Sequence, residues 1–310
     1  MVRGALLALA DNQNVKSLVT STPRLSDLVT RFAAGETDDD AIRVSSDLRD
    51  SGFSVTLDYL GEDTHDREQA DLTTGAYIRI LHRLKDAELT DSAEVSVKLS
   101  AIGQALPGDG QRIATDNARQ ICEAADAVGT TVTLDMEEHT TTDMTLETLH
   151  ELRADFPGTG AVLQAYLRRT EQDCRDLAVP GSRVRLCKGA YAEPESVAFQ
   201  ERTDIDRSYV RCMKVLLAGS GYPMFATHDP RLISIAEALT RRFGRDDGTY
   251  EYQMLFGVRR QEQRRLLEAG ERVRIYVPYG TEWYGYLVRR MAERPANLAL
   301  GIRAILDHHE

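Results

Sequence analysis

The chain has 310 residues, of which 42% are hydrophobic and 28% are charged, as in ordinary soluble globular proteins. Its net charge of -11 argues against nucleic acid as a main partner and against a broad basic membrane-binding face. No stretch reaches the roughly 20 apolar residues of a membrane span, and the four cysteines lack CxxC or metal-type spacing, so we expect a cytoplasmic protein with reduced thiols.

The first 50 residues are predicted to form an N-terminal helical arm with an acidic break at GETDDDA. From Ser54 onward, short stretches rich in β-branched and apolar residues alternate with stretches whose apolar residues recur at helical spacing. The predicted strands are SVTLDYL (54–60), EVSVKLS (94–100), TVTLDME (131–137), AVLQAY (161–166), RVRLCKG (183–189), PMFATHD (223–229), YEYQMLF (250–256) and RVRIYVP (272–278).

Eight alternations of strand and helix are typical of an α/β fold of the (βα)8 barrel type, which we assign to residues 51–310 because such barrels commonly need roughly 250 residues. An open doubly wound sheet is the structural alternative. Neither the GxGxxG nor the GxxxxGK[ST] motif of that fold class occurs in the chain.

Polar residues gather at the carboxyl ends of the predicted strands, where the catalytic residues of such barrels lie. They are Lys98, Ser100, Asp135, Glu137, Glu138, His139, Gln164, Tyr166, Arg185, Lys188, Thr227, His228, Asp229, Tyr276 and Tyr279. Because strands of a parallel barrel are buried on both faces, Lys98 must find a partner, and Asp135 on the neighbouring strand is the expected one. Arg185 and Lys188 are either ordinary ion-pair residues or, with the Gly-Ala step that follows them, a place where backbone approaches an anionic cofactor.

Near the C-terminus, the segment YGYLVRRMAERPAN places a polar stripe on one face of a predicted helix. Helical spacing brings Tyr286, Arg289, Arg290 and Glu293 onto that face. One interpretation is an amphipathic helix whose charged side faces water. The other is a paired-guanidinium clamp for a carboxylate, walled by an aromatic ring.

Three kinds of enzyme site fit the residues at the strand ends. A metal-dependent lyase or hydrolase would draw its ligands from the acidic and histidine residues, although no HxH or HxxxH pair occurs. A Schiff-base aldolase would use Lys98 or Lys188 as its nucleophile. A flavin enzyme that oxidises a small amino acid would need cations for the cofactor, an arginine clamp and aromatic walls. An interaction scaffold without activity would not need so many charges at one rim.

The motifs LDMEE, VLQAYL, RLCKGAY, ATHD, EYQMLFGV, RIYVPYG and YLVRRMAERPAN, in this order, resemble those of the proline dehydrogenase family over residues 54–297. The resemblance implies a distorted (βα)8 barrel whose last helix lies over the mouth and which holds FAD without a covalent bond. It implies oxidation of L-proline to Δ1-pyrroline-5-carboxylate, with hydride transfer from C5 to flavin N5 and electrons passed to a membrane quinone. The size resembles the monofunctional bacterial form, so a separate pyrroline-5-carboxylate dehydrogenase would take the product, and peripheral contact with the cell membrane is expected.

The resemblance also implies residue roles. Substrate binding is expected from Lys98, Tyr191, Tyr276, Tyr286, Arg289, Arg290 and Glu293, with the two arginines on the carboxylate. Cofactor binding is expected from Met136, Gln164, Arg185, Lys188, Gly189, Ala190, Thr227 and His228. Asp135 and Arg185 are the expected catalytic residues, and no metal ligand is implied. The sequence departs from the family at Ala192, often tryptophan, and at Asp229, often asparagine, so we expect altered stacking of the adenine.

Overall fold

The computed structural model describes residues 32–61 and 64–283. Its helices are α4 (Asp38–Asp50), α5 (Arg67–Asp86), α6 (Gly110–Val128), α7 (Thr142–Arg153), α8 (Thr170–Leu177), α9 (Arg202–Ala218), α10 (Pro230–Arg242) and α11 (Arg260–Glu268). Its strands are β1 (Ser54–Tyr59), β2 (Ala93–Val97), β3 (Val132–Leu134), β4 (Gly160–Gln164), β5 (Arg183–Cys187), β6 (Tyr222–Ala226), β7 (Glu251–Leu255) and β8 (Val273–Tyr279).

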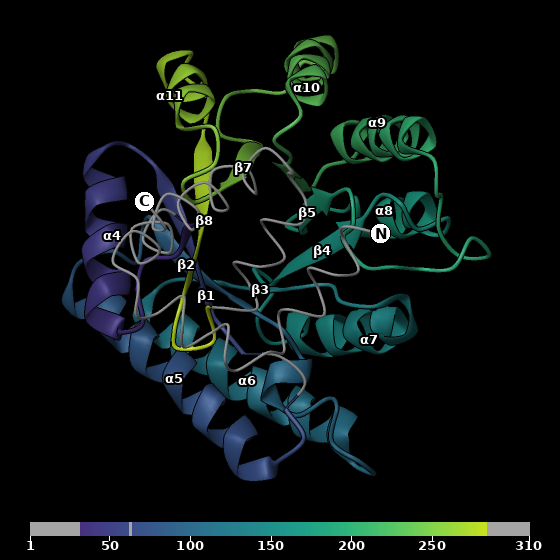
Figure 1. The fold of residues 1–310 in the computed structure, drawn as a ribbon. Helices are drawn as coiled ribbons and strands as arrows, with labels where there is room; N and C mark the ends of the chain where they lie inside the picture. Colours follow the sequence, from purple (N-terminus) through teal and green to yellow (C-terminus); the bar gives the residue numbers. More distant parts are fainter. Residues whose placement is uncertain (1–31, 62–63, 284–310) are drawn as a thin grey trace, which may run out of the picture.

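The strands of the described chain form a closed parallel barrel in sequence order, with β8 paired to β1. The helices surround this barrel (Figure 1). The predicted α/β barrel is therefore confirmed, and the open doubly wound sheet is excluded because a closed barrel has no edge strands.

Side chains along each strand alternate between the helices and the barrel interior. On β1, Val55 and Leu57 are completely buried in the apolar core that packs the helices onto the strands. The alternate residues Thr56 and Asp58 instead bind the polar side chains of Glu94 on β2 and of Lys98, the residue that follows β2. The interiors of such barrels are usually filled by branched apolar residues, so this polar interior positions the candidate site.

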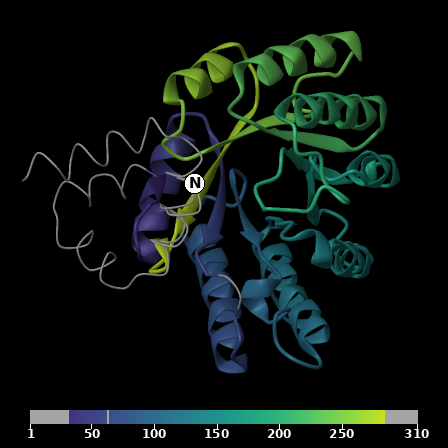
Figure 2. The same ribbon diagram turned by 45° about the vertical axis from the view of Figure 1, so that its right-hand side comes forward.

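The helix α4 packs on the outside of β1 and β8 and beside α5, as Figures 1 and 2 show. Thr37 begins the helix with a capping box that it shares with Asp40. Asp38 then binds Arg79 of α5 (2.8 Å). Part of the predicted N-terminal arm thus lies against the barrel, whereas the division at residue 50 stays a prediction. The predicted helix over the barrel mouth lies outside the described residues.

Several strands end earlier than the sequence pattern predicts. β3 ends at Leu134 and β6 at Ala226, so Asp135 and Thr227 stand in the loops that follow these strands. The apolar and β-branched run predicts where a strand begins, but the chain leaves the ladder where it must turn toward the next helix. The polar residues of the mouth therefore come from loops anchored on rigid strands.

Candidate active site

The lower half of the barrel interior, toward the amino ends of the strands, holds two glutamates and two arginines. Arg183 reaches across to Glu94 (Nη2–Oε2 2.6 Å), and Arg274 binds Glu251 (Nε–Oε1 2.7 Å). Arg274 also lies 3.8 Å from Glu94. We call these four residues the floor. Their charges cancel, so the floor is a neutral and tightly paired layer.

The floor perturbs the titration of its own glutamate. Burial raises the pKa of Glu94, but the guanidinium groups of Arg183, Arg274 and Arg185 outweigh burial and hold this pKa well below the usual range of a glutamate. Glu94 is therefore ionised at neutral pH.

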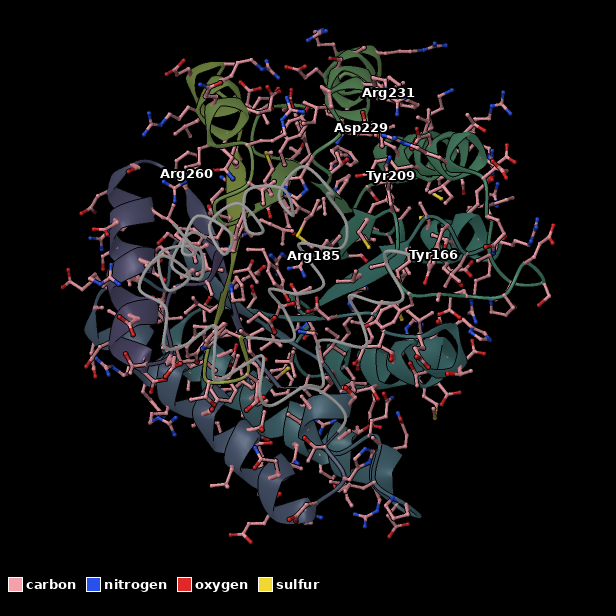
Figure 3. The ribbon with its side chains drawn as sticks, viewed as in Figure 1. Tyr166, Arg185, Tyr209, Asp229, Arg231 and Arg260 are labelled. Atoms are coloured by element: carbon pink, nitrogen blue, oxygen red, sulfur yellow. The ribbon has the colours of Figure 1, made fainter. Side chains whose placement is uncertain are left out.

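Arg185 lies above the floor, at the centre of the ring of helices in Figure 3. Its Nη1 donates to Asp135 Oδ1 (2.7 Å) and to Ser96 Oγ (3.0 Å), and its Nε donates to Gln253 Oε1 (2.5 Å). The guanidinium carbon lies 5.1 Å from the centre of the Tyr276 ring. Arg185 is only 4% exposed, so a buried cation is held from β2, the loop after β3, β7 and β8 at once.

Lys98 stands at the mouth between two carboxylates. Its Nζ lies 2.7 Å from Asp58 Oδ1 and 3.7 Å from Asp135 Oδ2. The expected pair with Asp135 is present, but Asp58 is the closer partner. The hydroxyl of Tyr276 donates to Asp135 Oδ2 (2.7 Å). Together with Arg185, these residues form what we call the mouth network, in which two cations face two carboxylates.

Burial shifts the pKa of two members of the mouth network, Asp58 and Tyr276. Burial raises the pKa of Asp58; Lys98 lowers it in part, Asp135 raises it again, and the net direction is upward. Burial, together with the charge of Asp135, also raises the pKa of Tyr276 well above its usual range. The Tyr276 hydroxyl therefore stays protonated and remains a hydrogen-bond donor.

The loop after β3 is fixed from both sides. The carboxylate of Glu137 accepts hydrogen bonds from the backbone N (3.1 Å) and the Oγ (2.6 Å) of Ser100. The Nε2 of Gln164 donates to the backbone oxygen of Glu137 (2.7 Å). Met136, the residue before Glu137, is buried. The structure thus gives Glu137 a role in holding the loop.

A second charged group lies at the carboxyl ends of β5 and β6. The Nζ of Lys188 lies 2.5 Å from Asp206 on α9 and 3.2 Å from Asp229, which begins α10. Arg231 binds both carboxylates (2.7 Å each), and Figure 3 shows Asp229 and Arg231 at the start of α10. We call these four residues the rim cluster. Hydrogen bonds from Arg231 and then Lys188 hold the pKa of Asp229 well below its usual range, although burial opposes them.

Gly189 brings bare backbone close to an aromatic ring. Its φ is +110°, and a Cβ at this position would meet the Tyr166 ring at 2.2 Å. Further along the same loop, Glu193 accepts hydrogen bonds from the backbone N of His139 (2.8 Å) and from the Tyr166 hydroxyl (3.4 Å), and it also contacts the His139 ring. Glu193 therefore ties the loop after β5 to the loop after β3.

The loop after β6 is also ordered by its polar residues. Thr227 Oγ1 accepts from the backbone N of Asp229 (3.1 Å). His228 Nε2 accepts from the backbone N of Leu255 (2.9 Å), so this ring nitrogen carries no proton and cannot donate there. The backbone oxygen of His228 accepts from Arg259 (3.0 Å). These contacts set the start of α10 against β7.

Comparison with known proteins decides the family. A family model described as proline dehydrogenase matches residues 41–300. The chain belongs to the proline dehydrogenase family.

Relatives within this family match nearly the whole chain. The proline dehydrogenase of Deinococcus radiodurans is 35% identical over 308 residues, which is 99% of this chain and 98% of the relative. Proline dehydrogenase 2 of Bacillus subtilis is 37% identical over 258 residues, or 83% of this chain and 84% of the relative. The crystal structure of proline utilization A (PutA) from Bdellovibrio bacteriovorus, inactivated by N-propargylglycine, matches with a TM-score of 0.79 and 27% identity, over 86% of this chain and 32% of that one.

The structure brings some of the residues expected from the proline dehydrogenase resemblance into two groups. Lys98, Asp135, Arg185 and Tyr276 meet in the mouth network, and Lys188 stands in the rim cluster beside the loop that carries Thr227 and His228. Gln164 and Met136 are buried near the end of β4 and after β3, and Ala190 and Tyr191 lie on the loop after Gly189. Tyr286, Arg289, Arg290 and Glu293 lie outside the described residues. The roles themselves stay predictions.

Several residues of this arrangement were not predicted from the sequence: Asp58, Gln253 and Glu193, the four residues of the floor, and Asp206 and Arg231 of the rim cluster. Asp58 and Gln253 stand within apolar strands, and a carboxylate or amide in such a strand is a signal that could have identified them. Glu193 carries no such signal, because an acidic residue in a loop is ordinarily solvated.

Within residues 32–61 and 64–283, no three His, Cys, Asp or Glu side chains converge as the ligands of a metal ion would. The expectation that no metal is bound stays a prediction. Among the helices of this part of the chain, none is both long and apolar enough to cross a lipid bilayer.

Proposed function

We propose that this chain oxidises L-proline to Δ1-pyrroline-5-carboxylate with non-covalently bound FAD. The observation that carries the proposal is the mouth network: a buried arginine, a lysine, two carboxylates and a tyrosine at the carboxyl ends of the strands, in a chain whose family match spans residues 41–300. Catalytic residues of barrel enzymes lie at this face. The relatives above are named for the same substrate.

The residues at the mouth fit FAD. Arg185 offers a buried cation that would stabilise the negative charge of a reduced flavin, and bound FAD would supply a two-electron acceptor. The backbone at Gly189, without a Cβ, allows a flat group to approach closely. Lys188, which follows β5, and Arg231, at the start of α10, suit a pyrophosphate. By resemblance, Met136, Gln164 and Ala190 would contact the flavin, and Thr227 with His228 would hold the adenosine side.

The chain's own residues would bind and orient proline. By resemblance, Arg289 and Arg290 would take the carboxylate in fork geometry with Glu293 orienting them, and this assignment rests on sequence alone. Tyr191, Tyr276 and Tyr286 would wall the ring and exclude water. Asp58 holds Lys98, Lys98 lies beside Asp135, and Asp135 in turn binds Arg185 and Tyr276.

The proton on the substrate amine sets the expected pH dependence. A cationic amine resists loss of a hydride from the adjacent carbon, so the amine must be neutral before C5 is oxidised. We therefore expect activity to rise with pH as the bound amine loses its proton.

The fate of the electrons and of the product completes the proposal. A membrane quinone would accept the electrons, and a separate pyrroline-5-carboxylate dehydrogenase would take the product. With a net charge of -11, contact with the inner face of the cell membrane would be local rather than through a broad basic face. We expect a cytoplasmic protein with such peripheral contact and no nucleic-acid partner.

Anaerobic addition of L-proline to the purified protein tests the proposal. The visible flavin band should bleach with L-proline and stay unchanged with buffer, and N-propargylglycine, which inactivated the related PutA, should abolish the response. A flavin band that L-proline leaves intact would refute the substrate. A protein that neither contains nor takes up FAD would refute the cofactor.

The Schiff-base aldolase is the second candidate, with Lys98 or Lys188 as nucleophile. Each lysine lies within 4 Å of two carboxylates, Asp58 and Asp135 for Lys98, and Asp206 and Asp229 for Lys188. Carboxylates favour the ammonium form, whereas a Schiff-base nucleophile must be neutral. The arrangement therefore weighs against this candidate. Borohydride trapping with a carbonyl substrate, followed by intact-mass measurement, should give no adduct.

A further inference from the structure

Gln253 of β7 is the neutral link between the floor and the mouth network. Its Nε2 donates to Glu251 Oε1 (2.6 Å), and its Oε1 accepts from Arg185 Nε (2.5 Å). The side chain is 3% exposed. Gln253 lies in the motif EYQMLFGV, but the resemblance gave it no role, and the proposed chemistry does not use it directly.

The orientation of the Gln253 amide is fixed by its neighbours. Glu251 is held in place by Arg274 (2.7 Å) and the Tyr222 hydroxyl (3.1 Å), and its carboxylate can only accept hydrogen bonds. The NH2 group of Gln253 must therefore face Glu251, which leaves the amide oxygen facing Arg185. The floor thus presents Arg185 with a preset acceptor and no additional charge.

Arg185 needs this acceptor because the carboxylate of Glu94, on the floor side, competes with Asp135 for the guanidinium group. Its Nη2 has no hydrogen-bond partner among the described residues and lies 3.9 Å from Glu94 Oε1. Asp135 holds Nη1 from the mouth side at 2.7 Å. If the hydrogen bond from Nε to Gln253 were lost, a rotation of the guanidinium toward Glu94 would satisfy Nη2 and draw the cation away from the mouth.

We propose that Gln253 is a positioning residue that keeps Arg185 at the height of the mouth, where the proposed function places the flavin. This inference rests on the proposed function. Its consequence is specific: removal of the amide should change the electrostatic field on bound FAD and slow flavin reduction, while proline binding, which depends on other residues, should change little.

The substitution Gln253→Met tests the proposal, because methionine keeps the length and bulk of glutamine but neither accepts from Arg185 nor donates to Glu251 as an amide does. We expect the midpoint potential of bound FAD, measured without substrate, to become more negative than in the unsubstituted protein, because a cation near the flavin stabilises its reduced, anionic form. We expect the flavin reduction rate in stopped flow to fall about tenfold or more, as for loss of a hydrogen bond to a charged group. The proline concentration for half-maximal rate should stay within about twofold, because a group that acts on the transition state alone leaves KM unchanged.

Gln111→Met is the matched control. Gln111 donates to the Met144 backbone oxygen (3.0 Å) and to Thr148 Oγ1 (2.8 Å) on the outside of the barrel. Its loss should lower stability without changing the potential or the reduction rate. If Gln253→Met does not fold, Gln253→Asn keeps a polar side chain but is one methylene too short to reach Arg185, and it should give the same shift.

The outcomes separate the two proposals. A folded, FAD-loaded Gln253 variant with an unchanged potential and reduction rate would overturn the positioning role and leave the proposed function intact. An equal change in Gln111→Met would also overturn it, since the effect would then be a general loss of stability. An unsubstituted protein that L-proline cannot reduce would overturn the proposed function, and the positioning role with it.

Discussion

The mouth network and the rim cluster both pair cations with carboxylates, but they differ in burial. In the mouth network, the side chains of Lys98 and Asp58 are 13% and 2% exposed. In the rim cluster, those of Lys188 and Arg231 are 29% and 62% exposed. Buried charges interact strongly and cannot be left unpaired, whereas exposed pairs contribute little and exchange partners readily. The mouth network is therefore suited to hold one geometry, and the rim cluster to exchange its internal pairs for an incoming anion.

Lys98→Met should have the largest effect, because it removes the cation that binds the buried Asp58 and leaves Arg185 alone to balance two carboxylates. We expect a loss of about 3–5 kcal/mol in the free energy of unfolding, together with a strong loss of proline oxidation. Urea unfolding and steady-state kinetics measure both. Lys214→Met, at an exposed position on α9, is the control and should change neither. Unaltered stability of the Lys98 variant would mean that the mouth network is not coupled as described.

Glu94→Gln tests whether the buried charges of the floor, like those of the mouth network, stabilise the folded protein. The pKa of Glu94 is lowered in the folded protein from the 4.5 of a free glutamate, so its contribution to stability is present above that pH and is lost as the pH falls through the folded-state value. We expect the variant to lose about 3 kcal/mol at neutral pH. The difference from the unsubstituted protein should shrink as urea unfolding is repeated at lower pH. A difference that is constant with pH would show that the charge is not responsible.

Gly189→Ala tests the close approach of the backbone to Tyr166, next to Lys188 of the rim cluster. The added Cβ would meet the Tyr166 ring at 2.2 Å, and the φ of +110° is unfavourable for alanine. Strain of about 1–3 kcal/mol is expected, and FAD affinity, measured by titration of the apoprotein, should fall about tenfold. Gly181→Ala is the matched control, because Gly181 also has a positive φ (+75°) but open space at its Cβ. Equal effects of the two substitutions would assign the loss to φ alone.

Asp229→Asn should have the smallest effect, and it should strengthen FAD binding rather than weaken it. Asparagine caps α10 as well as aspartate does, so the substitution removes only the charge that competes for Lys188 and Arg231. We expect FAD to bind about fivefold more tightly, the size of one exposed ion pair. The gain should decline as salt is added. Asp204→Asn, which removes an exposed pair with Arg207 on α9, should leave the affinity unchanged. Weaker binding in Asp229→Asn would mean that Asp229 supports the cofactor rather than competes with it.

The sequence predicted the polar residues at the carboxyl ends of the strands and missed Asp58 and Gln253, which contact them from within β1 and β7. Lys98 was predicted because a lysine in a buried strand must be paired, and Asp135 was the partner expected from the neighbouring strand. Asp58 is the closer partner because β1 pairs with β2 on the side opposite β3. Glu137 was predicted as one of the polar residues at the end of the third strand, and its bonds to Ser100 follow from the way β2 and β3 end side by side.

The sequence by itself determined the eight strands, their order and the face on which polar residues gather, because the alternation of apolar and polar residues is local and the parallel connections leave few topologies. Only the tertiary structure decided which buried charges meet. Lys98 and Asp58 are 40 residues apart, and Arg185 and Gln253 are 68 residues apart. Such pairings depend on barrel closure and on the height of each side chain in the interior, and no local pattern records either.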